Sequence, residues 1–205
     1  GCIKCLHCAA ACPQNAIRLG ELEGILPGEA PKLPKKSDEL IEDFLMSRRS
    51  YRHFKPEPVP RDILAKALRV SAWSPSAKNQ HPAKWIVVDS EDKIKEIMDQ
   101  ILKYLKATGE FPEILTLYER GHNVVLGTAR TLIIVYAGKD ARNPPVDTAL
   151  ALYNTDLMLQ SQGIGTCWAG YLVRLCNLDP ALQDILNLPE DARAYCALLA
   201  GYPYS

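Results

Sequence analysis

The sequence predicts a protein of helices and strands in which helices cover a central sheet. Short apolar runs lie at 84–90, 131–138, 166–172 and 194–202, and their lengths are those of buried strands. Longer segments with apolar residues at helical spacing precede or separate several of them. Strands separated by helices are typical of layered α/β and α+β architectures.

Capping residues and apolar spacing predict the helices. Ser37 is suited to cap the first helix, Pro60 stands in the first turn of the second, and Asp147 can cap the fourth. The third ends at Gly109, and Gly163 stands where a helix C-terminus favours a residue that adopts positive φ. The predicted helices are 37–49, 59–73, 92–109 and 147–162.

Charge and cysteine content exclude several classes of protein. Lys+Arg and Asp+Glu balance at 24 each, so the total charge does not indicate a nucleic-acid or anionic-membrane partner. No apolar run approaches the roughly 18 residues of a membrane span. Cys167, Cys176 and Cys196 are scattered, and seven cysteines form a poor disulfide framework. We therefore expect a reducing compartment, the cytoplasm.

Two shifts of composition divide the chain. Residues 1–17 are rich in Cys and Ala, whereas residues 18–36 hold three Gly, three Pro and no periodicity, which is typical of a linker. Regular structure is expected from Ser37 onward. We predict a cysteine-rich segment at 1–17, a linker at 18–36 and a larger domain at 37–205.

The cysteine-rich segment carries a metal-binding motif, GCIKCLHCAAACP. The spacing C-x2-C-x2-C-x3-C-P is that of bacterial ferredoxins, whose thiolates hold a [4Fe–4S] cluster. Structural zinc sites usually use two separated ligand pairs. The spacing therefore favours an iron–sulfur cluster over zinc, with structural or disulfide-bonded cysteines as a further alternative. The candidate ligands are Cys2, Cys5, Cys8 and Cys12.

The fourth cysteine of this motif predicts a second cluster. In two-cluster ferredoxins it ligates the other cluster, so Cys12 needs partners outside the motif. Cys167 and Cys196 are better explained as small buried hydrophobic residues. We expect a matching cysteine run upstream of Gly1, with this chain carrying half of a ferredoxin-type module.

The segment SRRSYR at 47–52 is a candidate phosphate site. It places Arg48, Ser50 and Arg52 at alternate positions, and in an extended chain these side chains project from one face. Two guanidinium groups and a hydroxyl suit a phosphate dianion because they offer charge-assisted and bidentate hydrogen bonds. A solvated helix end is the alternative, because cations there interact favourably with the helix dipole.

Two connections have the composition of loops that approach a planar ligand. WSPSAKNQHPAKWIVV (73–88) is polar and bounded by Pro, although turn chemistry alone also explains it. In GIGTCWAGY (163–171), Gly165 and Gly170 permit backbone N–H groups to face a ligand, and Trp168 can supply a wall. A core position is the alternative for Trp168.

In this order, RRSYR, SPSAKN and GIGTCWAG resemble the motifs of the nitroreductase family of FMN-dependent oxidoreductases, over about residues 38–203. With the cysteine motif, the chain resembles the subgroup that carries an N-terminal iron–sulfur module. The resemblance implies an α+β fold with a central mixed sheet flanked by helices, and a homodimer with FMN at the subunit interface.

The resemblance also implies roles for the basic segment. Arg48 and Ser50 resemble the phosphate-binding pair, and Arg52 resembles a contact to the ribityl chain or the ring. Family members continue past the GYP of 201–203 into an arm that adds a basic residue to the FMN phosphate. Without such an arm, phosphate binding rests on Arg48, Arg49 and Arg52.

Two further sets of FMN contacts follow from the same resemblance. One resembles the loop that the second subunit brings to the flavin, with His81 where many members have Gln. The other resembles the strand entry along the isoalloxazine, with a backbone N–H directed at N5. The first set is Pro75, Ser76, Ala77 and Asn79, and the second is Cys167, Trp168, Ala169 and Gly170.

The implied activity is ping-pong hydride transfer at FMN N5 to a small electrophile such as a nitro compound or quinone, with no catalytic side chain required. Electrons would come from a ferredoxin-type partner through the iron–sulfur module, or from NAD(P)H. Two alternatives stay open. One is a relative that fragments flavin or dehalogenates its substrate, and the other is an electron carrier or flavin-binding regulator without turnover.

Overall fold

The computed structural model describes residues 2–5, 8, 12–14, 16–17 and 34–204. The predicted linker at 18–36 therefore lies almost wholly outside the described residues. The chain divides into two compact units, residues 1–47 with 78–80, and residues 48–77 with 81–205. The domain boundaries predicted at 17 and 36 stay predictions.

The first unit contains one long helix, α2 (Ser37–Ser47), close to the bounds predicted for it. Asp38 and Glu39 stand in its first turn, where carboxylates interact favourably with the helix dipole. None of its residues is buried, and its apolar side chains Leu40 and Met46 are exposed. The helix thus carries apolar side chains that are exposed in the described part of the chain.

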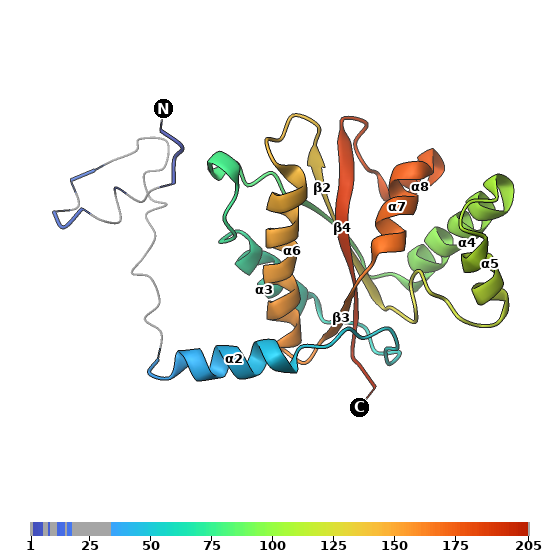
Figure 1. The fold of residues 1–205 in the computed structure, drawn as a ribbon, viewed down its shortest axis with the longest axis horizontal. Coiled ribbons are helices and arrows are strands. Elements are labelled where there is room, and N and C mark those ends of the chain that lie inside the picture. Colours follow the sequence, from blue (N-terminus) through green and yellow to red (C-terminus); the bar gives the residue numbers. More distant parts are fainter. Residues whose placement is uncertain (1, 6–7, 9–11, 15, 18–33, 205) are drawn as a thin grey trace. The chain divides into compact units, whose positions relative to one another are not determined.

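The second unit is built on a four-stranded sheet (Figure 1). The strand order is β1-β2-β4-β3, and all three strand pairs are antiparallel. The prediction of a mixed sheet is therefore wrong for these strands. Among the described residues, parallel pairing occurs only at the isolated bridge between Ser50 and Thr166. The strands are β1 (Lys84–Val88), β2 (Thr131–Gly138), β3 (Gly165–Trp168) and β4 (Ala192–Gly201).

Helices cover both faces of this sheet, with α3 and α6 on one side and α4, α5, α7 and α8 on the opposite side (Figure 1). Successive side chains of a strand point to opposite faces, so Leu132 and Ile134 join one core cluster while Ile133 and Val135 join the other. None of the described helices has both the length and the apolar character of a membrane span. The helices are α3 (Arg61–Ser71), α4 (Glu91–Thr108), α5 (Pro112–Glu119), α6 (Pro144–Gln160), α7 (Gly170–Leu178) and α8 (Pro180–Leu186).

The structure corrects two predicted elements. The strand expected at 166–172 ends at Trp168, because Ala169 (φ −102°, ψ 67°) leaves the extended conformation and α7 begins at Gly170. The apolar residues that follow recur at helical spacing and are buried on one side of α7. Helix α6 begins at Pro144 rather than at Asp147, and the Asp147 side chain is buried.

The core holds two buried thiols whose ionisation opposes folding at high pH. Burial raises the pKa of Cys176 to about 12 and that of Cys196 to about 11. In the unfolded chain both thiols ionise near pH 9. Between these values the unfolded state binds fewer protons than the native state, so the free energy of unfolding falls as pH rises.

We predict that Cys196→Ala makes this loss less steep. One thiol that stays protonated only in the native state contributes about 1.4 kcal/mol per pH unit between its two pKa values. Urea unfolding of both proteins under reducing conditions from pH 8 to 11 measures the slopes, and equal slopes would contradict the prediction.

Candidate functional site

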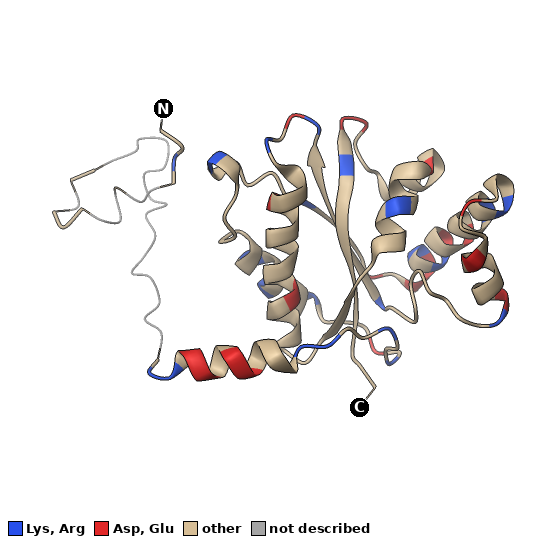
Figure 2. Cartoon of the chain, in the orientation of Figure 1, with Lys and Arg blue, Asp and Glu red and all other residues tan. Residues whose placement is uncertain are grey.

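The basic segment 48–52 lies against β3, in the second unit. Ser50 forms a parallel bridge with Thr166, and the Tyr51 N–H donates to the Thr166 carbonyl at 2.8 Å. The chain is thus extended at Ser50, which is the conformation that the phosphate-site prediction assumed. Figure 2 shows this segment as a blue stretch of chain directly after α2. Ser50 and Arg52 are exposed, and the Arg48 side chain is 27% exposed.

Two glycines allow the basic segment to approach the fold closely. A Cβ on Gly165 would lie 2.9 Å from the Tyr51 ring, and a Cβ on Gly127 would lie 2.2 Å from the Arg52 carbonyl oxygen. Gly127 also adopts φ +56°, a region that favours glycine. The Arg52 carbonyl accepts from the Thr128 N–H at 3.2 Å, so the backbone at Arg52 is held from a second side.

A buried carboxylate, Asp156 on α6, stands behind the basic segment. It is fully buried, and its Oδ1 accepts from Gln160 Nε2 at 2.9 Å and from the Thr166 hydroxyl. Its Oδ2 accepts from Trp168 Nε1 at 3.2 Å and lies 3.9 Å from Arg48 Nη1. One carboxylate therefore connects α6, β3 and the basic segment.

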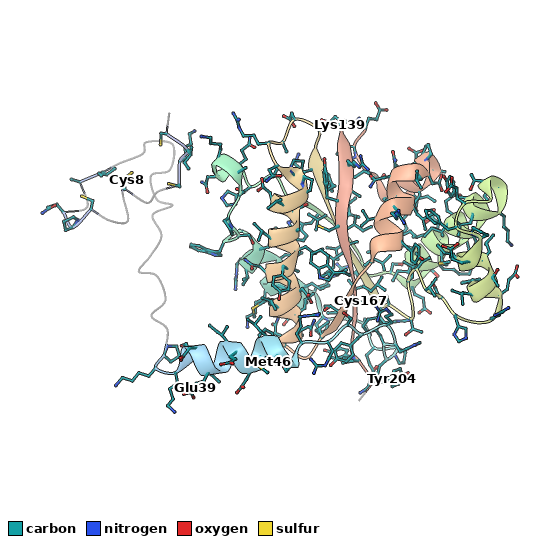
Figure 3. The ribbon with its side chains drawn as sticks, in the orientation of Figure 1. Cys8, Glu39, Met46, Lys139, Cys167 and Tyr204 are labelled. Carbon is teal, nitrogen blue, oxygen red and sulfur yellow. The ribbon has the colours of Figure 1, made fainter. Side chains whose placement is uncertain are left out.

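The charges of this network reach the Cys167 thiol. Burial raises the pKa of Cys167, the Arg52 guanidinium opposes that rise, the Asp156 carboxylate adds to it, and Arg48 opposes it. Both guanidinium groups and the carboxylate therefore act electrostatically on the same point of β3. Cys167 is buried and labelled beside the sheet in Figure 3. A thiol with a raised pKa is poorly nucleophilic.

The turn after β3 supplies an aromatic wall and backbone donors. Trp168 is 40% exposed, whereas Ala169 is buried and its N–H donates to the Ala197 carbonyl at 2.9 Å. That N–H is therefore committed to the sheet. Gly170 begins α7, and the first N–H groups of a helix have no partner within the helix. Gly170 is exposed and a Cβ there would meet open space.

The predicted loop at 74–82 is held by the opposite half of α6. The Ala77 N–H donates to Asp147 Oδ1 at 3.0 Å, and the His81 N–H donates to Ser76 Oγ at 2.9 Å. The short helix η2 (Ala77–Asn79) contains two non-glycine residues with positive φ, Lys78 at 55° and Asn79 at 57°. Such strained positions are more frequent at ligand sites than elsewhere.

A cavity of about 240 Å³ lies under this loop, and Pro75, Ser76 and Asp147 are among the residues that line it. Asn79 belongs to the first unit, where its side-chain amide donates to the carbonyls of Ile3 and Lys4 at 3.3 and 3.4 Å. Of the predicted loop residues, Pro75 and Ser76 therefore face a hollow.

Within one chain the predicted flavin contacts form two separate groups. The basic segment and the β3 turn meet at Asp156, whereas the loop is held at Asp147. These aspartates are nine residues apart on α6, which corresponds to roughly 13 Å along the helix axis. The first group is Arg48, Arg49, Ser50, Arg52, Cys167, Trp168, Ala169 and Gly170, and the second is Pro75, Ser76 and Ala77.

A wider cavity of about 610 Å³ lies elsewhere in the second unit, against the C-terminal half of α7. Phe111, Arg174 and Arg193 line it, together with other residues, and none of the predicted flavin contacts does. Cavity size therefore does not identify the same site as the sequence motifs.

The four cysteines of the ferredoxin-type motif are all described, and the structure does not assemble them into a metal centre. Cys2, Cys5 and Cys8 are exposed and Cys12 is partly buried. In the part of the chain that the structure describes, no three Cys, His, Asp or Glu side chains lie close enough to hold a metal ion. The iron–sulfur prediction therefore still rests on spacing alone.

Sequence reasoning missed Asp156 and Gln160. A signal for them exists, since both are polar, stand four residues apart on α6 and flank the apolar run 157–159 of a helix buried on several sides. Polar residues inside such a helix require partners, and their spacing places them on one face.

Together these groups can bind an anionic ligand with a planar part. Guanidinium groups, a hydroxyl and helix N-terminal amides are the donors that phosphate prefers, and an exposed indole offers a stacking face. The fold and the site thus define an α+β protein with a positively charged ligand-binding site at the end of its sheet. We call this site the cradle; it consists of the basic segment 48–52 and the turn Trp168–Gly170.

Comparison with known proteins assigns this fold to a family. The model of the nitroreductase family matches residues 45–202. The chain belongs to the nitroreductase family.

Two curated relatives and one solved structure illustrate the similarity. An iodotyrosine deiodinase of Nematostella vectensis is 26% identical over 84% of this chain and 70% of its own length. A putative NAD(P)H nitroreductase of Bacillus subtilis is 23% identical over 80% of this chain and 84% of its own length. The crystal structure of a Bacteroides fragilis nitroreductase with bound FMN superposes with a TM-score of 0.69 at 26% identity, covering 80% of this chain and 88% of that one.

We predict that Gly127→Ala lowers the free energy of unfolding more than Gly121→Ala does. Both glycines have positive φ, but a Cβ on Gly121 meets nothing within 4 Å. The backbone strain, roughly 1–2 kcal/mol, is common to both, and the clash with the Arg52 carbonyl adds about 1–3 kcal/mol for Gly127 alone. Urea unfolding measures both, and equal losses would mean that the chain at Arg52 is free to move aside.

Proposed function

We propose that this protein is an FMN-dependent oxidoreductase that reduces a small electrophilic acceptor. The observation that carries the proposal is the meeting of Arg48 and Trp168 at one buried carboxylate, Asp156, with Ser50 bridged to the strand that leads to Trp168. Family membership and the FMN-bound Bacteroides fragilis neighbour support the same cofactor.

The residues present fit FMN. Arg48, Arg49 and Ser50 would hold the phosphate, Arg52 would contact the ribityl chain or the pyrimidine edge, and Trp168 would cover one side of the ring. When bound, FMN supplies the two-electron chemistry at N5. The chain's own residues would bind and orient the cofactor. The Ala169 N–H is committed to the sheet, so the donor to the cofactor would be an N–H of the first turn of α7, which has no partner within the helix.

We infer that the active form is a homodimer in which the loop of Pro75, Ser76, Ala77 and Asn79 completes the partner's site. The separation of the Asp147 and Asp156 groups along α6 supports this, because the loop and the basic segment are held at different ends of that helix, roughly 13 Å apart along its axis. The exposed apolar side chains of α2 offer further area to a second copy.

We propose that electrons arrive either from NAD(P)H or through a ferredoxin-type module, in which Cys2, Cys5 and Cys8 would ligate one [4Fe–4S] cluster and Cys12 would ligate a second. The cysteine spacing is the support for the cluster. Two backbone N–H groups point at these sulfur atoms, Lys4 to Cys2 at 3.4 Å and Ala16 to Cys12 at 3.3 Å. Hydrogen bonds to the sulfurs are one means by which proteins tune such clusters.

Reductive dehalogenation is the second candidate reaction. Several of the similar curated proteins are iodotyrosine deiodinases, one of them covering 84% of this chain. Both candidates need the same reduced cofactor and differ in the acceptor, so turnover with a nitroaromatic or a quinone against an iodophenol distinguishes them.

We predict that Arg48→Ala weakens FMN binding roughly 10- to 150-fold. One charge-assisted hydrogen bond is worth about 1.5–3 kcal/mol, which corresponds to that range. Titration of apoprotein with FMN, followed by flavin fluorescence, measures the dissociation constant.

The matched control is Arg61→Ala, since Arg61 is a far more exposed arginine paired with Asp89 at 2.9 Å and lies outside the cradle. It should leave FMN affinity unchanged. An Arg48→Ala protein that binds FMN as wild type does would remove the phosphate role from Arg48.

We predict that protein purified without oxygen contains iron and acid-labile sulfide in near-equal amounts, and that Cys5→Ser abolishes both while leaving FMN content unchanged. Cys5 is exposed and belongs to the first unit, so its loss does not disturb the cradle. Elemental analysis decides the outcome. One zinc with no sulfide would exclude the ferredoxin-type cluster.

A further inference from the structure

Burial of the Asp156 carboxylate costs free energy, and its contacts with neighbouring groups have to offset that cost. A charged group removed from water is stable only when it is paired and hydrogen-bonded. Asp156 is 0% exposed, and four donors from the surrounding elements reach it, Gln160, Thr166, Trp168 and Arg48. Each of these contacts is one that a carboxylate makes, because its oxygen atoms accept hydrogen bonds and attract a guanidinium group.

The two oxygen atoms of this carboxylate serve different parts of the molecule. Oδ1 accepts from Gln160 and Thr166, which ties α6 to β3. Oδ2 faces Trp168 Nε1 at 3.2 Å and Arg48 Nη1 at 3.9 Å, which are the aromatic wall and a cation of the cradle. The fold is therefore joined through one oxygen and the ligand site through the other.

The charge of Asp156 also enters the electrostatics of the cradle. It acts on the Cys167 thiol in the direction opposite to Arg52 and Arg48. Asp156 lies 3.9 Å from Arg48, so its carboxylate partly offsets the positive charge of the cradle. Charges a few ångströms apart interact more strongly in a buried environment than in water.

We propose that Asp156 is a positioning residue of the flavin site that also sets how tightly the protein holds reduced relative to oxidised FMN. This inference rests on the proposed function. Two-electron reduction adds negative charge to the flavin, and positive charge in the cradle favours the reduced form. A buried anion beside Arg48 and Trp168 reduces that preference and keeps the bound cofactor a stronger reductant.

The experiment is the midpoint potential of bound FMN in the wild-type protein and in Asp156→Asn, measured under anaerobic conditions against a reference dye. The Asn side chain keeps the volume and one oxygen for Thr166 and Gln160, and it removes the charge. We expect reduced FMN to gain roughly tenfold in affinity over oxidised FMN, a positive shift of about 30 mV for a two-electron couple. Asp156→Leu, which also removes the charge and fills a similar volume, should shift in the same direction and serves if the Asn variant does not fold.

The matched control is Asp179→Asn. Asp179 is another buried aspartate and is 4% exposed. Its side chain caps α8 and accepts a hydrogen bond from Gln100 at 2.7 Å, and neither of these contacts involves a residue of the cradle. Its substitution tests the effect of losing a buried carboxylate as such, and the FMN potential should stay at the wild-type value. An equal shift in Asp179→Asn would reduce the Asp156 effect to general destabilisation and overturn the inference.

The result that refutes the role of Asp156 differs from the one that refutes the proposed function. Wild-type protein that takes up no FMN would reject the flavin site itself. FMN bound by both the wild-type protein and the Asp156 variant, with unchanged potential, would leave the flavin site standing and reject the role of Asp156.

Discussion

The attachment of residues 48–55 to the end of the sheet is the constraint on which the site depends. The Tyr51 N–H bonds to Thr166 at one end of this segment, and the Lys55 N–H bonds to the Tyr202 carbonyl at the other, both at 2.8 Å. Arg48 and Arg52 therefore take their positions from the backbone of β3 and the residues after β4. A pair of long cationic side chains would otherwise lose considerable rotamer entropy on binding one ligand.

That attachment needs space, and small residues provide it. Gly165 leaves room for the Tyr51 ring, and Gly201 leaves room for Phe54, whose Cβ would lie 2.8 Å from an added Cβ. Each of these two glycines thus faces an aromatic side chain of residues 51–54. Within GIGTCWAG only Gly165 has this packing role, because a Cβ on Gly163 or Gly170 would meet nothing within 4 Å.

Much of the fold follows from the sequence because each of these elements has one pattern over its whole length. The runs at 131–138 and 84–88 are short, continuous and rich in β-branched residues, which is typical of buried strands, whereas apolar residues recur at helical spacing in 91–108. The segment 166–172 changes period at Ala169, and a window that spans the change cannot separate strand from helix. Helices α5 and α8 are short and begin at proline, so they offer little periodicity to detect.

The site was only partly predictable for a different reason. Motif residues such as Arg48 and Trp168 stand out in the chain, but the residue that joins them is defined by tertiary contacts between positions 108 residues apart and 12 residues apart. Asp156 lies outside the three sequence motifs that predicted the site. The signal for such residues is a polar side chain inside an apolar helix, and it states a need for partners without naming them.

The local field of the site is independent of the net charge of the chain. The balance of 24 cations and 24 anions argues against a polyanionic partner, yet Arg48, Arg49 and Arg52 stand within five residues of each other. A ligand there would meet guanidinium groups with a buried carboxylate, Asp156, 3.9 Å from one of them. A surface anion would be screened by water and salt, whereas the Asp156 carboxylate is fully buried and its effect on the cradle persists at physiological ionic strength. The negative charge of Asp156 lies beneath the site rather than on its rim. The outer face of the cradle therefore stays positively charged and can bind an anionic ligand, while the buried carboxylate limits the preference of the cradle for reduced cofactor.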